Sequence, residues 1–150
     1  MNRLRWSAGV VITMLLTATP VFAQQPSAAG RIKVVSGAAF IVRQSVTIPA
    51  ELGQDVFETD SLKTGADGRI GVTLKDDTRV SLGPGSELHL QRFVYEPGTG
   101  SLGMVIQFVR GAAAYVSGRM AKLAPQSIRL ETPAAIVGVR GTSLAIRVGH

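Results

Sequence analysis

Apolar and polar residues alternate one by one through the middle of the chain, from residue 70 to residue 90. This period of two is typical of a strand with one buried face, whereas a helix would spread the same residues around its axis. Turn-forming residues interrupt the alternation at 75–78 and 83–86, at intervals of about ten residues. The pattern therefore predicts three short consecutive strands. Their apolar residues are Ile70, Val72, Leu74, Val80, Leu82, Leu88 and Leu90.

Shorter apolar runs extend this pattern toward the N-terminus. Residues 31–36 and 38–42 predict two strands that form a hairpin around Gly37. Residues 46–48 predict a further strand in a second pair. Because Pro49 lacks an amide donor, we expect that strand to lie at a sheet edge or to end there.

The second half of the chain contains another alternating run. Residues 102–108 place Leu, Met, Ile and Phe on one face, and Arg110-Gly111 is expected to reverse the chain so that 112–117 forms the second strand of a hairpin. Residues 97–100 predict a turn before this run. Residues 118–125 are basic and without periodicity, which predicts a mobile loop.

The C-terminal end holds two more alternating segments, 128–130 and 144–148, which predict a final pair of strands. Between them lies 138–142, where two glycines on either side of a Val-Arg pair indicate a constrained backbone. We expect the Arg140 guanidinium to be held by backbone carbonyls or by Glu131, since a half-buried charge must be paired. The alternative is a contact with a carboxylate of a partner.

These patterns together predict an all-β fold of short antiparallel strands and hairpins, arranged as a two-layer sandwich or a β-solenoid-like stack. The chain has 150 residues, of which 45% are hydrophobic and only 5% aromatic. It is therefore expected to form a single domain with an aliphatic core. It has no cysteine, so its stability must come from packing.

Two sets of short motifs recur in a fixed order along this pattern. The C-terminal set comprises Thr132, Pro133, Gly138, Arg140, Gly141 and Thr142. The turn set comprises Gly65, Asp67, Gly68, Asp76 and Asp77. Across residues 31–148, their order and spacing resemble the FecR-like domain, which is named for the periplasmic regulator of ferric citrate uptake.

The resemblance implies a sensing or relay module that holds no cofactor. Full-length regulators of this family join a cytoplasmic sigma-factor-binding segment, a membrane helix and this periplasmic domain. The present chain departs from that pattern, because an export signal occupies its N-terminus and nothing after Val148 is long enough for a further signalling domain. Direct control of a sigma factor is therefore not expected.

The N-terminus has the features of a secretory signal peptide. Arg3 and Arg5 precede an apolar run at 8–16, and small residues before Gln24 suit a cleavage site. We expect residues 1–23 to be the signal peptide, 24–30 a flexible leader and 31–150 the FecR-like domain. The protein is then periplasmic or secreted, with no membrane span after cleavage; a retained anchor is the alternative.

The net charge of the chain is +6, and removal of the two signal-peptide arginines leaves +4. Most of the excess lies in the last third, from Arg92 onward. Scattered, solvated charges explain so small an imbalance, although a basic face for phosphate, lipid head groups or an acidic partner is the alternative. Stacking aromatics are not interleaved with the basic residues, so nucleic-acid binding is not expected.

No motif for catalysis, cofactor binding or metal binding is evident, so we predict no residue for these roles. The acidic residues between 55 and 67 do not have the spacing of a calcium loop and are expected to form turns. His89 falls between two apolar residues and should face solvent. An enzyme of unrecognised type would require His89 to meet Asp55, Glu58 or Asp60.

The function that these observations favour is contact with another macromolecule in the bacterial envelope, as a signal relay or a protein scaffold. The partner is expected to be an envelope protein that meets a strand edge or a flat face. A cell-wall glycan is the alternative partner, although the low aromatic content does not favour carbohydrate binding.

Overall fold

The computed structural model describes residues 18–139 and 143–149 of the chain. The described residues form one sheet of twelve strands, together with one short α-helix and one turn of 3-10 helix. The fold is all-β, as the sequence predicts. The strands are β1 Gly30–Ser36, β2 Ala39–Arg43, β3 Val46–Pro49, β4 Asp55–Val56, β5 Ser61–Thr64, β6 Arg69–Leu74, β7 Arg79–Leu82, β8 Glu87–Glu96, β9 Ser101–Val116, β10 Ile128–Glu131, β11 Ile136–Gly138 and β12 Ser143–Val148. The helices are α1 Arg119–Leu123 and η1 Pro125–Ser127.

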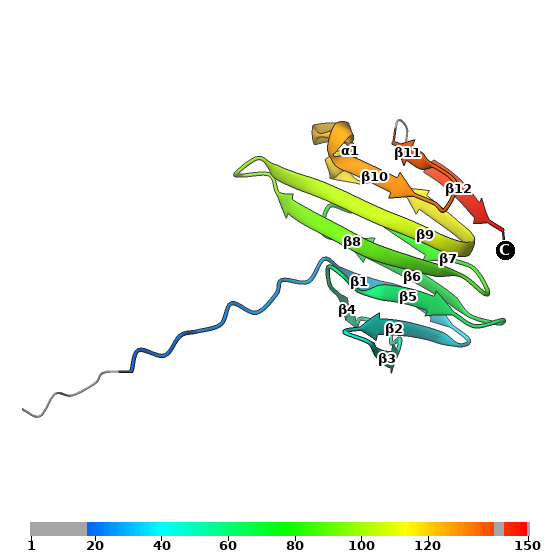
Figure 1. Ribbon diagram of the computed structural model, residues 1–150, viewed down its shortest axis with the longest axis horizontal. Coiled ribbons are helices and arrows are strands. Elements are labelled where there is room, and N and C mark those ends of the chain that lie inside the picture. The colour runs from blue at the N-terminus through cyan, green and yellow to red at the C-terminus, as the bar shows by residue number, and fades with distance from the viewer. Residues whose placement is uncertain (1–17, 140–142, 150) are drawn as a thin grey trace, which may run out of the picture.

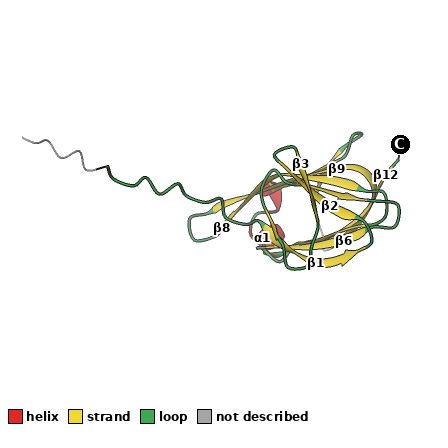
Figure 2. Ribbon diagram, turned by 90° about the horizontal axis from the view of Figure 1, so that it is seen from below, coloured by secondary structure: helices red, strands yellow, loops and turns green. Residues whose placement is uncertain are grey.

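The sheet curls around strand β9, which has 16 residues. The first half of β9 pairs with β8 and its second half pairs with β7, so the strand order is β3-β2-β5-β8-β9-β7-β6-β1-β4. Strands β2 and β3 lie on one side of the molecule, and β1 and β6 lie on the other (Figure 2). We call the two halves the β8 layer (β2, β3, β5, β8, β10, β11 and the first half of β9) and the β6 layer (β1, β4, β6, β7, β12 and the second half of β9).

The hairpin predicted at Arg110-Gly111 is wrong. Residues 101–116 form one continuous strand, because Gly111 bends the strand with a φ of +85° while the pairing resumes on the other layer, with Ala113 opposite Leu82. The hairpin partner of β9 is β8, across the turn at 97–100 that the sequence does predict. A single glycine thus redirects a strand from one layer to the other.

The hairpin predicted around Gly37 is also wrong. Strand β1 pairs with β4 and β6, and β2 pairs with β3 and β5, so the turn at Gly37 carries the chain from one layer to the other. The strand at 46–49 lies at the sheet edge and includes Pro49 at its end, as predicted.

The chain crosses between the layers repeatedly, which unites features of the two predicted architectures. It passes from β1 to β2 and β3, back to β4, over to β5, back to β6 and β7, and over to β8. Neighbours within a layer are nevertheless antiparallel, as in a sandwich, except that β10 runs parallel to β9. Strands β10 and β12 both pair with β9 and not with each other, so the predicted final strand pair is wrong.

The core lies between the two layers and follows the predicted alternation. The inward-facing residues of β6, β7 and β8 are at most 4% exposed up to Leu90. Most of the largest fully buried side chains are aliphatic, and two of them, Tyr115 and Phe108, are aromatic. The other large members of this group are Ile32, Ile41, Ile70, Met104, Ile106, Met120 and Leu130.

Residues 118–125 do not form the predicted loop. They contain helix α1, whose Met120 is fully buried in the core. A helix of only five residues is too short to produce a periodic pattern in the sequence. At the other end of the chain, residues 18–27 extend away from the sheet and are exposed, and Ala29 is already buried next to β1 (Figure 1). Among the described residues, no helix has the length and apolar character needed to cross a membrane.

Candidate functional site

The turn before β6 holds the two layers together at one end. The amide of Ala38 donates to Asp67 Oδ1 at 3.4 Å, and the amide of Gly65 donates to the carbonyl of Ala38 at 2.8 Å. A Cβ on Gly68 would lie 1.9 Å from that same carbonyl, so no larger residue fits. Gly65, Asp67 and Gly68 therefore fix the crossing from β1 to β2 and offer no free functional group.

The turn between β6 and β7 anchors helix α1 through Asp76. Its carboxylate is fully buried and accepts hydrogen bonds from the Thr78 amide at 3.1 Å, the Thr78 hydroxyl at 2.7 Å and the Met120 amide at 3.3 Å. Asp77, with a φ of +68°, is exposed and forms an ion pair with Arg119 at 2.9 Å. Both aspartates are thus structural. The nearby Tyr115 hydroxyl is also buried, and this burial raises the pKa of Tyr115.

The acidic residues near 55–60 have partners within the domain. Asp60 is 1% exposed and accepts two hydrogen bonds from the Arg43 guanidinium, at 2.9 and 2.7 Å, and one from the Phe57 amide at 2.9 Å. The guanidinium also lies 4.6 Å from the centre of the Phe57 ring. The hydrogen bond to Asp60 raises the pKa of Arg43. This is a partly buried ion pair with two parallel hydrogen bonds, which is the strong geometry for arginine and a carboxylate.

The other two carboxylates of this region are also occupied. Asp55 pairs with Arg31 at 3.2 Å, and Glu58 accepts the Phe93 amide at 2.9 Å. Asp60 points into the core, while His89, opposite Ser61 in the sheet, is half-exposed on the outer face. The described part of the chain does not bring His89 together with these acids as an enzyme site would require, and it contains no cluster of three or more metal-binding side chains.

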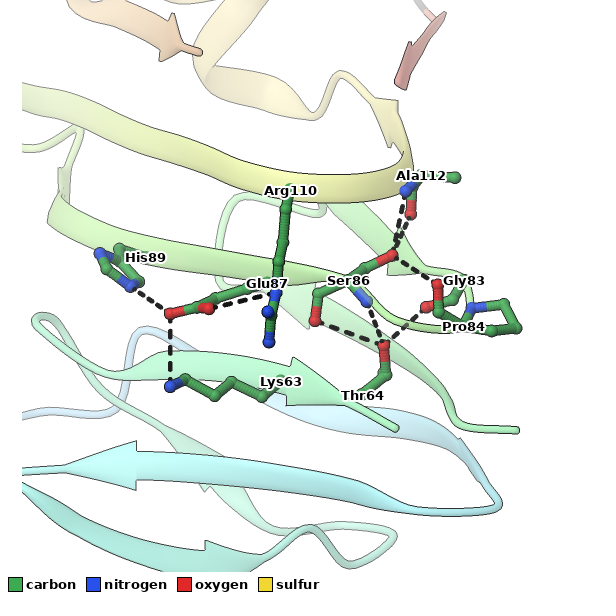
Figure 3. A network of polar contacts seen from close by, with 9 residues as sticks. All are labelled: Lys63, Thr64, Gly83, Pro84, Ser86, Glu87, His89, Arg110 and Ala112. Carbon is green, nitrogen blue, oxygen red and sulfur yellow. Dashed lines mark hydrogen bonds and ion pairs between the residues drawn. The ribbon is translucent and has the colours of Figure 1, made fainter. Parts of the chain in front are cut away.

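The outer face of the β8 layer carries an ion-pair cluster around Glu87 (Figure 3). Its carboxylate lies 3.0 Å from His89 Nε2, 3.5 Å from Lys63 Nζ and 3.5 Å from Arg110 Nε. Partial burial raises the pKa of Glu87, but the hydrogen bond with His89 and the charge of Lys63 outweigh it, and the pKa is lowered overall. The cluster links β5, β8 and β9 across the layer.

A second network joins the bend of β9 to the β8 layer (Figure 3). The Ser86 hydroxyl donates to the Ala112 carbonyl and accepts the Ala112 amide, both at 3.0 Å. The Thr64 hydroxyl donates to the Gly83 carbonyl at 2.7 Å and accepts the Ser86 amide at 2.9 Å. These buried hydroxyls satisfy backbone groups that the bend removes from the regular strand ladder.

The C-terminal motif lies at the turn between β10 and β11 and beyond. The Thr132 hydroxyl accepts the Ala135 amide at 3.1 Å and closes this turn, with Pro133 exposed at its tip. Gly138 ends β11 opposite Arg129. Arg140, Gly141 and Thr142 lie outside the described residues, so the predicted role of Arg140 remains a prediction. Glu131, its predicted partner, forms an ion pair with Arg129 at 3.1 Å.

Strand β12 is the longest of the described strands that pair with a neighbour on one side only. All six of its residues pair with β9 on one side, and no described strand pairs with the other side. The remaining edges are short or blunted, because β4 has two residues, β11 has three and β3 ends in Pro49. The inward side chains of β12 are only partly buried. They are Leu144, Ile146 and Val148.

The same end of the molecule is hollowed beside β10 and β11. A hollow of about 590 Å³ opens there, with Ile136 67% exposed at its rim. In the view of Figure 1, β10, β11 and β12 all lie above the long strand β9. An open strand edge beside exposed apolar residues is the usual form of a protein-contact site. The hollow is lined by Pro125, Gln126, Ile128, Arg129, Ile136, Val137, Gly138 and Val139.

The fold and these networks define an all-β domain in which the buried acidic residues hold the strands and turns together. The family model described as FecR protein matches residues 60–150, which is more than half of the chain. The chain therefore belongs to the FecR family, and the resemblance found in the sequence is confirmed. Members of this family are regulatory, signalling-related proteins associated with the cell envelope. No curated protein and no solved structure matches the chain.

Sequence reasoning missed the pair between Arg43 and Asp60 and the cluster around Glu87. The partners in the first pair are 17 residues apart, and their contact depends on how β2 and β5 pair. One signal was available for Glu87. It alternates with the apolar Leu88 on the same strand as His89, and residues two apart on a strand share a face.

Proposed function

We propose that this protein is an exported, non-enzymatic FecR domain that acts through contact with another protein in the bacterial envelope. Export is supported by the charged and apolar pattern at 3–16 and the small residues before Gln24. A role without catalysis is supported by the acidic residues of the described chain, since the buried ones serve turns and strand contacts. The FecR family match supports a part in signalling.

The observation that carries this proposal is the open edge of β12. An edge strand presents backbone amides and carbonyls that an extended segment of a partner can pair with, and its side chains supply specificity. The other layer edges are blunted, whereas β12 has six residues and its one charged side chain, Arg147, points outward. A partner strand added here would cover Leu144, Ile146 and Val148, which the domain alone leaves half-exposed.

Complex formation in gently solubilised envelopes tests the proposal. A tagged chain should migrate on native gels as part of a larger assembly, and Ile146→Lys should abolish that assembly, because an inward lysine on an edge strand opposes strand addition. Val46→Lys, on the opposite edge strand β3, is the matched control and should leave the assembly intact. Val46 is 59% exposed, so the added charge stays in water.

Two results would contradict the proposal. One is migration of the unmodified chain as a free monomer in the envelope fraction. The other is equal loss of the assembly in the two lysine variants, with both folded as shown by circular dichroism. Recovery of the chain only from the cytoplasm, with Met1 retained, would overturn export.

A further inference from the structure

The outer face of the β6 layer is strongly basic. Its strands carry five basic side chains and a single acidic one, Asp55 of β4, which pairs with Arg31 at 3.2 Å. The other four basic residues are exposed and have no ion pair with any described residue. The five are Arg31, Lys33, Arg69, Arg79 and Arg147.

Strand register arranges these charges in rows that run across the strands. Two of these rows contain arginines, and a central row without charged residues lies between them. The first row is Arg31, Thr73, Arg79, Val116 and Ser143. The central row is Val34, Gly71, Ser81, Ala114 and Ala145. The third row is Ser36, Arg69, Gly83, Ala112 and Arg147.

A hollow lies over part of the central row and part of the third row. From β6 to β12 the side chains of the central row are no larger than that of serine, and the hollow, of about 410 Å³, covers Gly71, Ser81 and Ala114 of this row. Arg69 lies at its margin, and Val34, which is 55% exposed, closes one end. The face thus offers a shallow hollow across β6, β7 and β9 with Arg69 at its margin, and Arg31, Arg79 and Arg147 lie elsewhere on the same face.

We propose that this basic face binds an extended acidic segment of a partner polypeptide. Free guanidinium groups are suited to carboxylates, which they bind through two parallel hydrogen bonds. The strands of this face carry no exposed aromatic ring, so a sugar chain would find no stacking surface. A planar lipid surface would leave the hollow empty. The surface includes the outward side chains of Ala145 and Arg147 on β12 but not the open backbone edge of that strand, and it does not depend on strand addition there.

The spacing of the arginines matches that of an extended peptide. Successive side chains of such a peptide point to opposite sides at about 3.4 Å per residue, and neighbouring strands of the sheet are about 4.8 Å apart. Arg69 and Arg147 share a row and lie three strands apart, about 14 Å, which equals four peptide residues and returns to the same side. Arg79 lies one strand from Arg69 on the opposite side. The fitting segment therefore carries acidic residues at positions i, i+1 and i+4.

Binding of a synthetic peptide to the purified chain tests this inference. The probe is a fluorescent twelve-residue peptide with glutamates at i, i+1 and i+4 among small neutral residues, and fluorescence anisotropy measures its affinity at low salt. The double variant Arg69→Glu/Arg79→Glu should weaken binding by about tenfold or more, since two attractions become repulsions. The matched control, Arg92→Glu/Lys122→Glu, makes the same charge change on other surfaces and should alter affinity less than about twofold.

Several outcomes would overturn the inference. The first is failure of the peptide to bind, and the second is equal weakening by the two double variants, which would indicate attraction by net charge alone. Tighter binding of a linear polyuronate or of phosphatidylglycerol vesicles through the same arginines would assign the face to a glycan or a membrane. Thermal melting verifies that the variants fold; if the glutamates prevent folding, Arg69→Gln/Arg79→Gln against Arg92→Gln/Lys122→Gln replaces them. Because β12 is unchanged in these variants, their results are independent of the strand-edge test.

Discussion

The two layers use their charges in opposite ways. On the outer face of the β8 layer, Glu87 lies among three basic side chains, and on the inner side of the same layer Arg43 reaches the buried Asp60. On the β6 layer, Arg69, Arg79 and other basic residues have no described carboxylate partner. The inner faces of the layers are alike, since both bury aliphatic residues. The comparison shows that the location of the acidic residues, and not the net charge of +6, determines which face has unpaired basic side chains.

The largest effect is expected where the β8 layer uses its charges for stability. Asp60→Ala leaves the Arg43 guanidinium without its buried partner and the Phe57 amide without an acceptor. We expect a loss of about 3 kcal/mol or more in the free energy of unfolding, measured by urea denaturation. Asp60→Asn retains an acceptor and should lose less. A loss below about 1 kcal/mol for Asp60→Ala would show that the pair is not structural.

The bend that joins the layers should be the next most sensitive position. Gly111→Ala places a Cβ 2.2 Å from Ser86 Oγ at a φ of +85°, so both crowding and backbone strain oppose it. We expect a loss of about 2 kcal/mol in thermal or urea unfolding. Gly100→Ala is the control, because its φ is +74° but no atom lies within 4 Å of the added Cβ. Equal losses of stability in both variants would show that crowding at the bend does not contribute to the loss.

The cluster around Glu87 should contribute a smaller, pH-dependent stability. Folding lowers the pKa of Glu87. The stability that the cluster contributes is therefore present above the usual carboxyl range and is lost as the pH falls through the lowered pKa. Glu87→Gln should cost about 0.5–1 kcal/mol at pH 7 and progressively less as the pH falls below the usual carboxyl range. Glu96→Gln, at the exposed end of the same strand, is the control and should cost less than Glu87→Gln at pH 7, because Glu96 has no ion pair with any described residue. A pH-independent difference for Glu87→Gln would contradict the ion-pair assignment.

The smallest effect is expected on the unpaired face of the β6 layer. Arg69→Ala and Arg79→Ala should each change the free energy of unfolding by less than about 0.5 kcal/mol, because no intramolecular partner is lost. Urea denaturation of the two variants beside Asp60→Ala measures the contrast directly. Losses above about 1 kcal/mol would show that these arginines serve the fold, and the distinction between the two faces would fail.

Much of the fold was predictable because burial follows the period of a strand. The inward residues of β6, β7 and β8 stand at alternate positions, and each is buried as expected. Two of the errors fall at Gly37 and Gly111, where a positive φ serves a crossing or a bend in place of a hairpin. A local glycine marks a change of direction, but the partner strand is decided by pairing between distant segments.

The two proposed contact surfaces were harder to predict from the sequence than the fold. The basic excess was expected in the last third, yet the unpaired basic face draws Lys33, Arg69 and Arg79 from the first two thirds and Arg147 from the end. These residues meet only through the registers of five strands. The open edge of β12 likewise depends on β10 pairing with β9 elsewhere, which no local pattern shows.

Photocrosslinking in intact envelopes tests most directly the claim that the protein works by contact through β12 and not through the ion-paired face. A photoreactive residue at Ala145, outward on β12, is compared with one at Gln91, exposed on β8. The account predicts a discrete protein adduct from Ala145 and none from Gln91. An adduct from Gln91 alone, or from neither position, would contradict it.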